Sequence, residues 1–198
     1  MYTKADILFV IFMCLFSCKQ AEDYYHLPTY SSNNILQAVI EIPAGTNKKF
    51  EYNSQTNTFE IDKKNGVERV IQFLPYPGNY GFIPSTYSNP EKGGDGDALD
   101  VLVLSETVST GTVIEIIPIG VLKLIDDGEI DSKIIAIPAN SLKQIIKVKT
   151  YQEFLIKYPE AKNIIESWFL NYNKEDLASI NGWGTEQEAI LEIENSKL

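Results

Sequence analysis

Residues 91–106, EKGGDGDALDVLVLSE, place three aspartates directly before a strongly apolar run. Asp95, Asp97 and Asp100 fall within six residues, and residues 101–104 have the composition of a buried strand. Carboxylates crowded at the mouth of a core strand repel one another and resist removal from water. The segment therefore predicts a site at which cations neutralise the three acids beside the core.

The spacing of the three aspartates also predicts a local geometry. In a regular strand, side chains alternate between the two faces, so Asp95 and Asp97 would point one way and Asp100 the other. All three converge only if residues 93–96, which are rich in glycine, form a turn and the regular strand starts near Ala98.

The pattern along the chain predicts strands first and helices afterwards. Predicted strands cover residues 36–43, 49–52, 58–62, 98–104, 112–124 and 132–138, with a further short strand at 69–73. Residues 74–97 are rich in proline and glycine, and a loop of that length in a compact domain is usually functional. Capping boxes at Thr150 and Thr185 predict a helix from 151 to about 158, a second ending near 172 and a terminal helix. This order predicts an α+β fold with a closed or strongly curved sheet.

The N-terminus has the features of an export signal. After Lys4, residues 7–16 are apolar but too few to span a bilayer. The run ends in a small residue followed by Cys18, which resembles a bacterial lipoprotein signal. We expect a signal peptide at 1–17, lipidation of Cys18, a tether at 18–35 and one domain at 36–198. The alternative is an ordinary signal peptide or an anchor helix with Cys18 incidental. The lipoprotein interpretation predicts an exported protein, held at a membrane of the bacterial periplasm or cell envelope by its lipid anchor alone.

Composition excludes several classes of function. The net charge of −10 argues against a nucleic acid as partner. His26 is the sole histidine, which disfavours a Ser-His-Asp triad and a histidine-rich zinc site. No GK[ST] phosphate loop or GxGxxG motif is present. The chemistry must therefore come from carboxylates, tyrosines, lysines and the single arginine.

A second acidic cluster, DDGEID at residues 126–131, lies at the end of another predicted strand. Oxygen-only ligand sets suit hard cations such as Mg²⁺ and Mn²⁺. A calcium loop starting at Asp95 is a poor alternative, because Leu99 and Asp100 stand where that loop needs an oxygen ligand and a glycine.

In order along the chain, these motifs resemble those of the family I soluble inorganic pyrophosphatases. Residues 94–104, GDGDALDVLVL, have that family's D-x-D-x-x-D pattern followed by an apolar strand. Four further segments are similar to the family's first strands, tyrosine loop, second acidic segment and last site segment: residues 39–52, 76–84, 120–138 and 168–172. The resemblance covers about residues 36–194. It implies a five-stranded OB-like β-barrel with flanking, mostly C-terminal helices, and hydrolysis of inorganic pyrophosphate to two phosphates.

The resemblance also implies roles for individual residues. Asp97 would take the proton of the attacking water. Glu41 would lie next to the metal ligands without binding the metal itself. The cofactor would be Mg²⁺, several ions per site, with Mn²⁺ as a substitute. The metal ligands would be Asp95, Asp100, Asp126, Asp131 and Glu51. The phosphate oxygens would contact Lys49, Arg69, Tyr76, Tyr80, Lys133 and Tyr172.

Two positions depart from the family pattern. Counting without gaps from Glu51 places Lys63 where the family has an arginine, whereas the sole arginine, Arg69, lies six residues later. A guanidinium suits phosphate better than an ammonium, so we expect Arg69 to fill the role. Asn173 stands where the family usually has a lysine, and Lys174 is the candidate replacement.

The family resemblance further implies a homo-oligomer, in bacteria often a hexamer. Two alternatives remain open from the residues alone. One is hydrolysis of another phosphoanhydride, such as a nucleotide or a short polyphosphate. The other is a lipoprotein that binds divalent ions on the same fold without catalytic activity.

Overall fold

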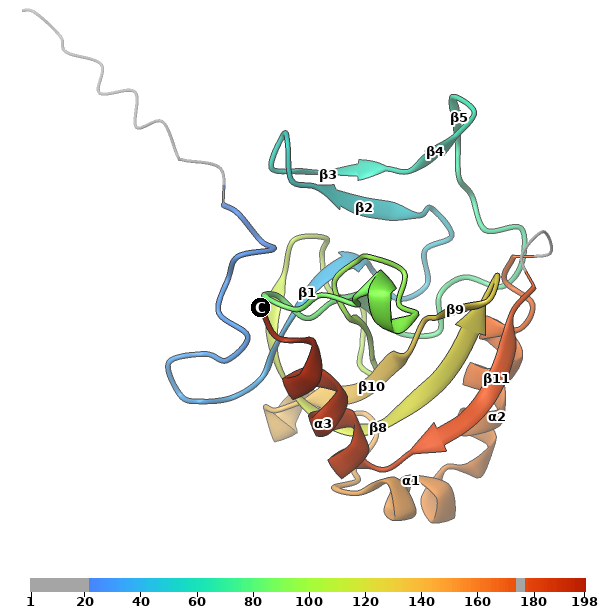
Figure 1. Ribbon diagram of the computed structural model, residues 1–198. Helices are drawn as coiled ribbons and strands as arrows, with labels where there is room; N and C mark the ends of the chain where they lie inside the picture. Colours follow the sequence, from blue (N-terminus) through green and yellow to red (C-terminus); the bar gives the residue numbers. More distant parts are fainter. Residues whose placement is uncertain (1–21, 174–176) are drawn as a thin grey trace, which may run out of the picture.

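The computed structural model describes residues 22–173 and 177–198 (Figure 1). The expected signal peptide at 1–17, Cys18 and Lys174 lie outside these ranges. In the described ranges, no helix is both long enough and apolar enough to cross a membrane.

Five strands close into the predicted β-barrel (Figure 1). In order around the ring, they are β1 (Gln37–Ile42), β6 (Asn79–Phe82), β7 (Asp100–Val103), β10 (Lys133–Pro138) and β8 (Val113–Asp126). The ring closes because β8 pairs with β1 as well as with β10. All pairs are antiparallel except β7 with β10, which run parallel. Closure brings the ends of strands far apart in sequence to one barrel mouth.

Strand β6 lies inside the segment expected to be a loop, and Gly81 explains how it fits. A Cβ atom at Gly81 would lie 1.9 Å from the carbonyl oxygen of Val39 on β1. Only glycine therefore allows the two strands to approach so closely. The contact fixes Tyr80, the neighbouring residue, at the barrel mouth.

Strand β8 is 14 residues long and extends beyond the ring. Its extension pairs with two strands that the sequence pattern did not predict, β9 (Glu129–Ile130) and β11 (Ser179–Gly184). Strand β11 has the sequence SINGWG, whose asparagine and glycines disfavour a strand on propensity alone. Pairing with β8 decides its conformation.

Two short hairpins stand apart from the barrel, at the top of Figure 1. One pairs β2 (Phe50–Asn53) with β3 (Thr58–Ile61), and the other pairs β4 (Lys63–Lys64) with β5 (Val67–Glu68). The strand predicted at 69–73 was wrong: the second hairpin ends at Glu68, and after it only Val70 forms an isolated bridge, with Lys48. Asn65 and Gly66 have φ of 55° and 80°, the left-handed values that a tight hairpin turn requires.

The helices come late in the chain, as predicted, and lie on the side of the barrel away from the hairpins (Figure 1). They are α1 (Tyr151–Lys157), α2 (Pro159–Phe169) and α3 (Glu186–Ser196), with 3₁₀ turns η1 (Pro90–Lys92) and η2 (Ser141–Lys143). Thr150 and Thr185 cap α1 and α3 as predicted, and Thr185 completes its capping box with Glu188. Helix α2 ends at Phe169 and not near residue 172.

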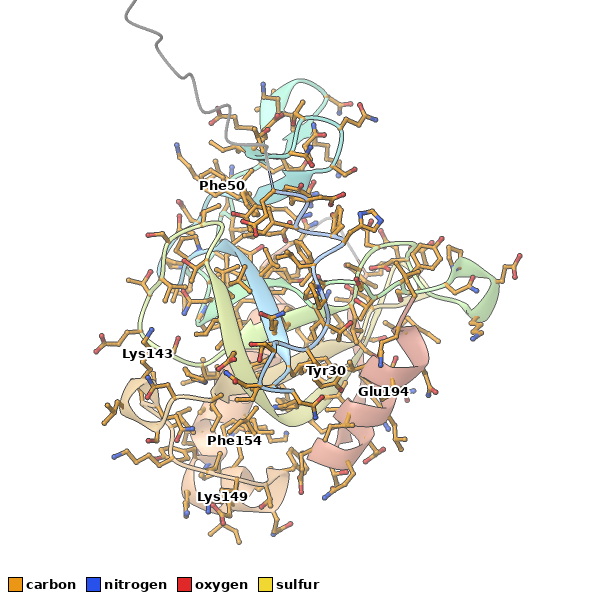
Figure 2. All side chains as sticks on the ribbon, turned by 90° about the vertical axis from the view of Figure 1, so that its left-hand side faces the viewer. Tyr30, Phe50, Lys143, Lys149, Phe154 and Glu194 are labelled. Carbon is orange, nitrogen blue, oxygen red and sulfur yellow. The ribbon has the colours of Figure 1, made fainter. Side chains whose placement is uncertain are left out.

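The core fills the barrel and the space under the helices. Phe154 of α1 and Phe169 of α2 are fully buried in one cluster with Leu122 and Ile135 of the barrel (Figure 2 labels Phe154). Burying a phenylalanine contributes roughly 1.5–3 kcal/mol, so these contacts hold the helices to the barrel.

Residues 22–35, the described part of the expected tether, lie against the barrel. The ring centroids of Tyr24 and Tyr25 are 5.3 and 5.1 Å from that of Tyr52. Farther along, the Tyr30 hydroxyl donates a 2.6 Å hydrogen bond to Glu194 of α3, and Figure 2 shows the two residues side by side. The packed structure therefore begins before residue 36.

Candidate active site

A cavity of about 330 Å³ lies where the barrel mouth meets strand β2 and the end of α2. Every residue expected to bind metal or phosphate or to accept a proton lines it. They are Glu41, Lys49, Glu51, Arg69, Tyr76, Tyr80, Asp95, Asp97, Asp100, Asp126, Asp131, Lys133 and Tyr172. Segments more than 100 residues apart in the sequence thus meet at one place.

The glycine-rich turn before β7 has the predicted geometry. Gly93 and Gly96 have φ of 89° and 87°, and the regular strand starts at Asp100. Within the turn, the backbone N–H of Asp97 donates a 3.0 Å hydrogen bond to Asp95 Oδ1. The turn therefore releases the three aspartates from strand alternation and directs them into the same cavity.

Lys133 balances two of the acids. It is 3% exposed, and its Nζ donates hydrogen bonds to Asp100 Oδ2 and Asp131 Oδ1. The Tyr80 hydroxyl donates a 2.5 Å hydrogen bond to the same oxygen of Asp100. Burial alone would lower the pKa of an ammonium, but the two carboxylates outweigh it and raise the pKa of Lys133. The side chain is therefore a fixed positive charge.

Arg69, and not Lys63, reaches the cavity. Its guanidinium donates a 2.7 Å hydrogen bond to Asp62 Oδ2, and Lys49 Nζ lies 2.6 Å from Glu51 Oε1. Lys63 is exposed on β4. The β4–β5 hairpin accounts for this, because it inserts residues 63–68 between β3 and the arginine. Sequence reasoning missed Asp62, since only the hairpin brings it to Arg69.

Aromatic rings form one wall of the cavity. The Trp168 ring lies 4.5 Å from Tyr76 and stacks on Tyr172 at 4.8 Å, while its Nε1 donates a 2.8 Å hydrogen bond to the Leu74 carbonyl. Burial raises the pKa values of Tyr76 and Tyr80 well above the usual range. These phenols therefore stay protonated and can donate hydrogen bonds to an anion.

Burial affects Glu41 and Asp97, and also Asp131, whose pKa it raises to about 6. Glu41 is 8% exposed, and burial raises its pKa to about 8, although its Oε1 accepts a 2.7 Å hydrogen bond from the Tyr52 N–H. Burial also raises the pKa of Asp97, and the negative charges of Asp95 and Asp100 add to the effect. All three groups therefore hold protons more strongly than exposed carboxyl groups do.

Asn79 holds the surrounding loops and was not predicted. Its buried amide makes four hydrogen bonds. Oδ1 accepts from the backbone N–H groups of Ala44 and Val108, and Nδ2 donates to Ser105 Oγ and to the Glu106 carbonyl. Its place directly before Tyr80, in the tyrosine loop at residues 76–84, was the available signal.

The lining carries seven carboxyl groups and three cationic side chains, so it is rich in oxygen donors and net negative. These donors fit hard divalent cations chemically. Nevertheless, no three histidine, cysteine or acidic side chains within 22–173 and 177–198 are grouped closely enough to hold a metal ion as they stand. The acids are thus gathered in one cavity, with Lys133 between two of them.

A closed barrel whose mouth combines these acids with lysines, an arginine and tyrosines defines a site for a small polyanion accompanied by divalent cations. Comparison with known proteins agrees. A family model described as inorganic pyrophosphatase matches residues 38–197. The chain therefore belongs to the inorganic pyrophosphatase family.

Individual relatives cover most of the chain. The inorganic pyrophosphatase of Neisseria meningitidis serogroup B is 38% identical over 169 residues, which are 82% of this chain and 86% of that protein. The crystal structure of an inorganic pyrophosphatase from Neisseria gonorrhoeae is 36% identical with a TM-score of 0.66, covering 82% of this chain and 88% of the other. That from Thermus thermophilus is 28% identical with a TM-score of 0.70, covering 88% and 97%.

Proposed function

We propose that this protein hydrolyses inorganic pyrophosphate to two phosphates, with Mg²⁺ as its cofactor and Mn²⁺ as a substitute. The observation that carries the proposal is the convergence of acids, cations and tyrosines on one cavity. Pyrophosphate is small and highly charged, so its binding needs cations and hydroxyl donors and no apolar pocket. Family membership over most of the chain supports the same activity.

The oxygen donors for Mg²⁺ would be Asp95, Asp100, Asp126, Asp131 and Glu51. Glu41 would lie next to these ligands without binding the metal itself. Bound Mg²⁺ neutralises carboxylate and phosphate charge and makes water more acidic. Asp97 accepts the proton of the attacking water. Its carboxyl group lines the same cavity as the expected metal ligands, which places it where the attacking water would be held.

The cationic and phenolic side chains bind the substrate. Arg69 offers a planar donor fork that matches two phosphate oxygens, and Asp62 holds that fork in place. Lys49 provides a second positive charge on the same side of the cavity, 3.8 Å from Asp62. Lys133 donates to Asp100 and Asp131 in the metal-free protein, and its ammonium would contact a phosphate oxygen if a divalent cation replaced it at these two carboxylates. Tyr76, Tyr80 and Tyr172 add hydroxyl donors.

A phosphate-release assay on three substrates tests the proposal. Purified protein would be given pyrophosphate, ATP or tripolyphosphate, each with and without Mg²⁺. We expect Mg²⁺-dependent release from pyrophosphate that greatly exceeds release from the other two. Equal or greater release from ATP or tripolyphosphate would favour a different phosphoanhydride, and no release from any substrate would favour a protein that only binds ions.

We further propose that the chain is exported, acylated at Cys18 and assembled as a homo-oligomer. The support for acylation is the apolar run that ends in a small residue and Cys18. Firm retention at a membrane would need the several acyl chains of a lipoprotein, since one chain binds only marginally. Mass spectrometry of the native mature protein tests acylation, and an unmodified Cys18 would refute it. Light scattering tests the oligomeric state.

A further inference from the structure

A segment outside the family match contributes a tyrosine to the active-site cavity. The match begins at residue 38, whereas Tyr25 lines the cavity together with Glu41, Asp97 and Phe82. Neither the acidic motifs nor the family resemblance pointed to this residue.

The backbone around Tyr25 is fixed to the loop that follows β6. The Ser85 N–H donates a 2.8 Å hydrogen bond to the Tyr25 carbonyl, and Ser85 Oγ donates one of 2.8 Å to the Leu27 carbonyl. Thr29 Oγ1 donates a third, of 3.0 Å, to the Pro84 carbonyl. Three hydrogen bonds within five residues hold the segment in one position against the barrel.

The ring of Tyr25 is fixed as well. Its centroid lies 4.6 Å from that of Phe82 on β6 and 5.1 Å from that of Tyr52 on β2. Aromatic pairs at these distances contribute attraction beyond simple burial. Tyr25 therefore bridges the barrel and the β2–β3 hairpin, and its side chain lines the cavity together with Glu41 and Asp97.

The hydroxyl of Tyr25 is chemically suited to an anion. Within residues 22–173 and 177–198 it makes no hydrogen bond, whereas the Tyr80 hydroxyl already donates to Asp100. Burial, followed by the charges of Glu41 and Asp97, raises the pKa of Tyr25 above its usual range. The group is thus a neutral donor without an acceptor among the described residues.

We propose that Tyr25 is a further substrate-binding residue, whose hydroxyl donates a hydrogen bond to a phosphate oxygen of bound pyrophosphate. This inference rests on the proposed function. It makes the N-terminal segment part of the active site and not only a link to a membrane.

The test compares Tyr25→Phe with Tyr24→Phe. The first removes only the hydroxyl at the cavity, and the second removes a neighbouring hydroxyl that does not line it. Steady-state kinetics on pyrophosphate would give KM and kcat, and calorimetry would give the affinity for imidodiphosphate, a non-hydrolysable analogue, in the presence of Mg²⁺. We expect Tyr25→Phe to raise KM and weaken analogue binding about three- to tenfold, with kcat little changed and Tm unchanged. Tyr24→Phe should match the wild type.

Wild-type KM and analogue affinity in Tyr25→Phe would overturn the inference. Equal losses in both variants would also overturn it, because they would show an effect of packing. If the wild type does not hydrolyse pyrophosphate, the proposed function fails, but the two analogue affinities still decide whether the Tyr25 hydroxyl contacts the anion.

Discussion

Lys133 and Asp100 face each other across the parallel strands β10 and β7, and the ammonium of Lys133 donates to the Asp100 carboxylate. Asp131 accepts a second hydrogen bond from the same nitrogen. A single buried cation thus holds two acids that are expected to bind metal. Stability without metal should depend on this lysine.

We expect Lys133→Met to reduce the free energy of unfolding in EDTA by roughly 3–5 kcal/mol, because it leaves two largely buried carboxylates, 22% and 13% exposed, without their cation. Mg²⁺ should restore part of the loss by binding the native state. Lys123→Met is the control, since Lys123 pairs with Glu188 at the surface and should cost no more than about 1 kcal/mol. Denaturant titrations with EDTA and with Mg²⁺ would measure both. Equal losses of unfolding free energy in the two variants would show that the hydrogen bonds of Lys133 to Asp100 and Asp131 do not stabilise the protein.

Arg69→Lys should lower kcat/KM for pyrophosphate by about ten- to a hundredfold, because an ammonium cannot replace the donor fork of the guanidinium. Lys63→Ala should change kcat/KM little, since Lys63 is exposed on β4 and does not line the cavity. Steady-state kinetics would compare the two variants. A larger loss in Lys63→Ala than in Arg69→Lys would show that Lys63 fills the arginine role, as counting without gaps suggests.

Asp97→Asn should keep the fold and most of the affinity for Mg²⁺ but lower kcat by roughly 10²–10⁴-fold, as expected for a lost general base. Asp100→Asn should weaken Mg²⁺ binding more than Asp97→Asn does, because Asp100 is an expected ligand. Single-turnover kinetics with calorimetric titration of Mg²⁺ would separate these effects. A fully active Asp97→Asn protein would show that another group accepts the proton.

The raised pKa of Glu41 predicts a pH-dependent stability in the metal-free protein. The native state keeps the Glu41 proton up to about pH 8, whereas the unfolded chain loses it near the ordinary carboxyl pKa. Stability from this group is therefore complete at low pH and is lost as the pH rises between those two values. Glu41→Gln removes the titration and keeps an acceptor for the Tyr52 N–H.

Between about pH 5 and about pH 8, the metal-free wild type should lose on the order of 3 kcal/mol of unfolding free energy relative to Glu41→Gln. Urea titrations of both proteins in EDTA would measure the difference at each pH. A difference that stays constant with pH would show that Glu41 is ionised throughout.

Local signals predicted most of the elements and the acidic part of the site. The turn at residues 93–96, the strand that follows and the caps at Thr150 and Thr185 depend on residues close together in sequence, and all are present. Strand β11 was missed because its conformation comes from pairing with β8 and not from its own residues. The β4–β5 hairpin was missed although Asn65-Gly66 is a hairpin signal, because each of its strands has only two residues and shows no alternating apolar pattern.

The contacts between functional groups were harder to predict. Asp100 and Lys133 are 33 residues apart, and only the parallel pairing of β7 with β10 brings them together. Tyr25 lies in a polar stretch with no periodic pattern, so nothing local indicates that it packs against Phe82. Long-range strand pairing and aromatic packing determine these positions, and neither can be predicted from residue spacing or composition.

The packing of residues 22–35 determines how far a lipid at Cys18 would stand from the catalytic centre. Position 25 is seven residues after position 18, so a fully extended chain between them reaches about 25 Å at most. Ser85 holds the backbone at Tyr25 and Leu27, so residues 25–35 add nothing to this reach. An acylated enzyme would therefore work within a shallow layer at the bilayer surface, where the local concentration of an anionic substrate depends on the charge of the lipid headgroups.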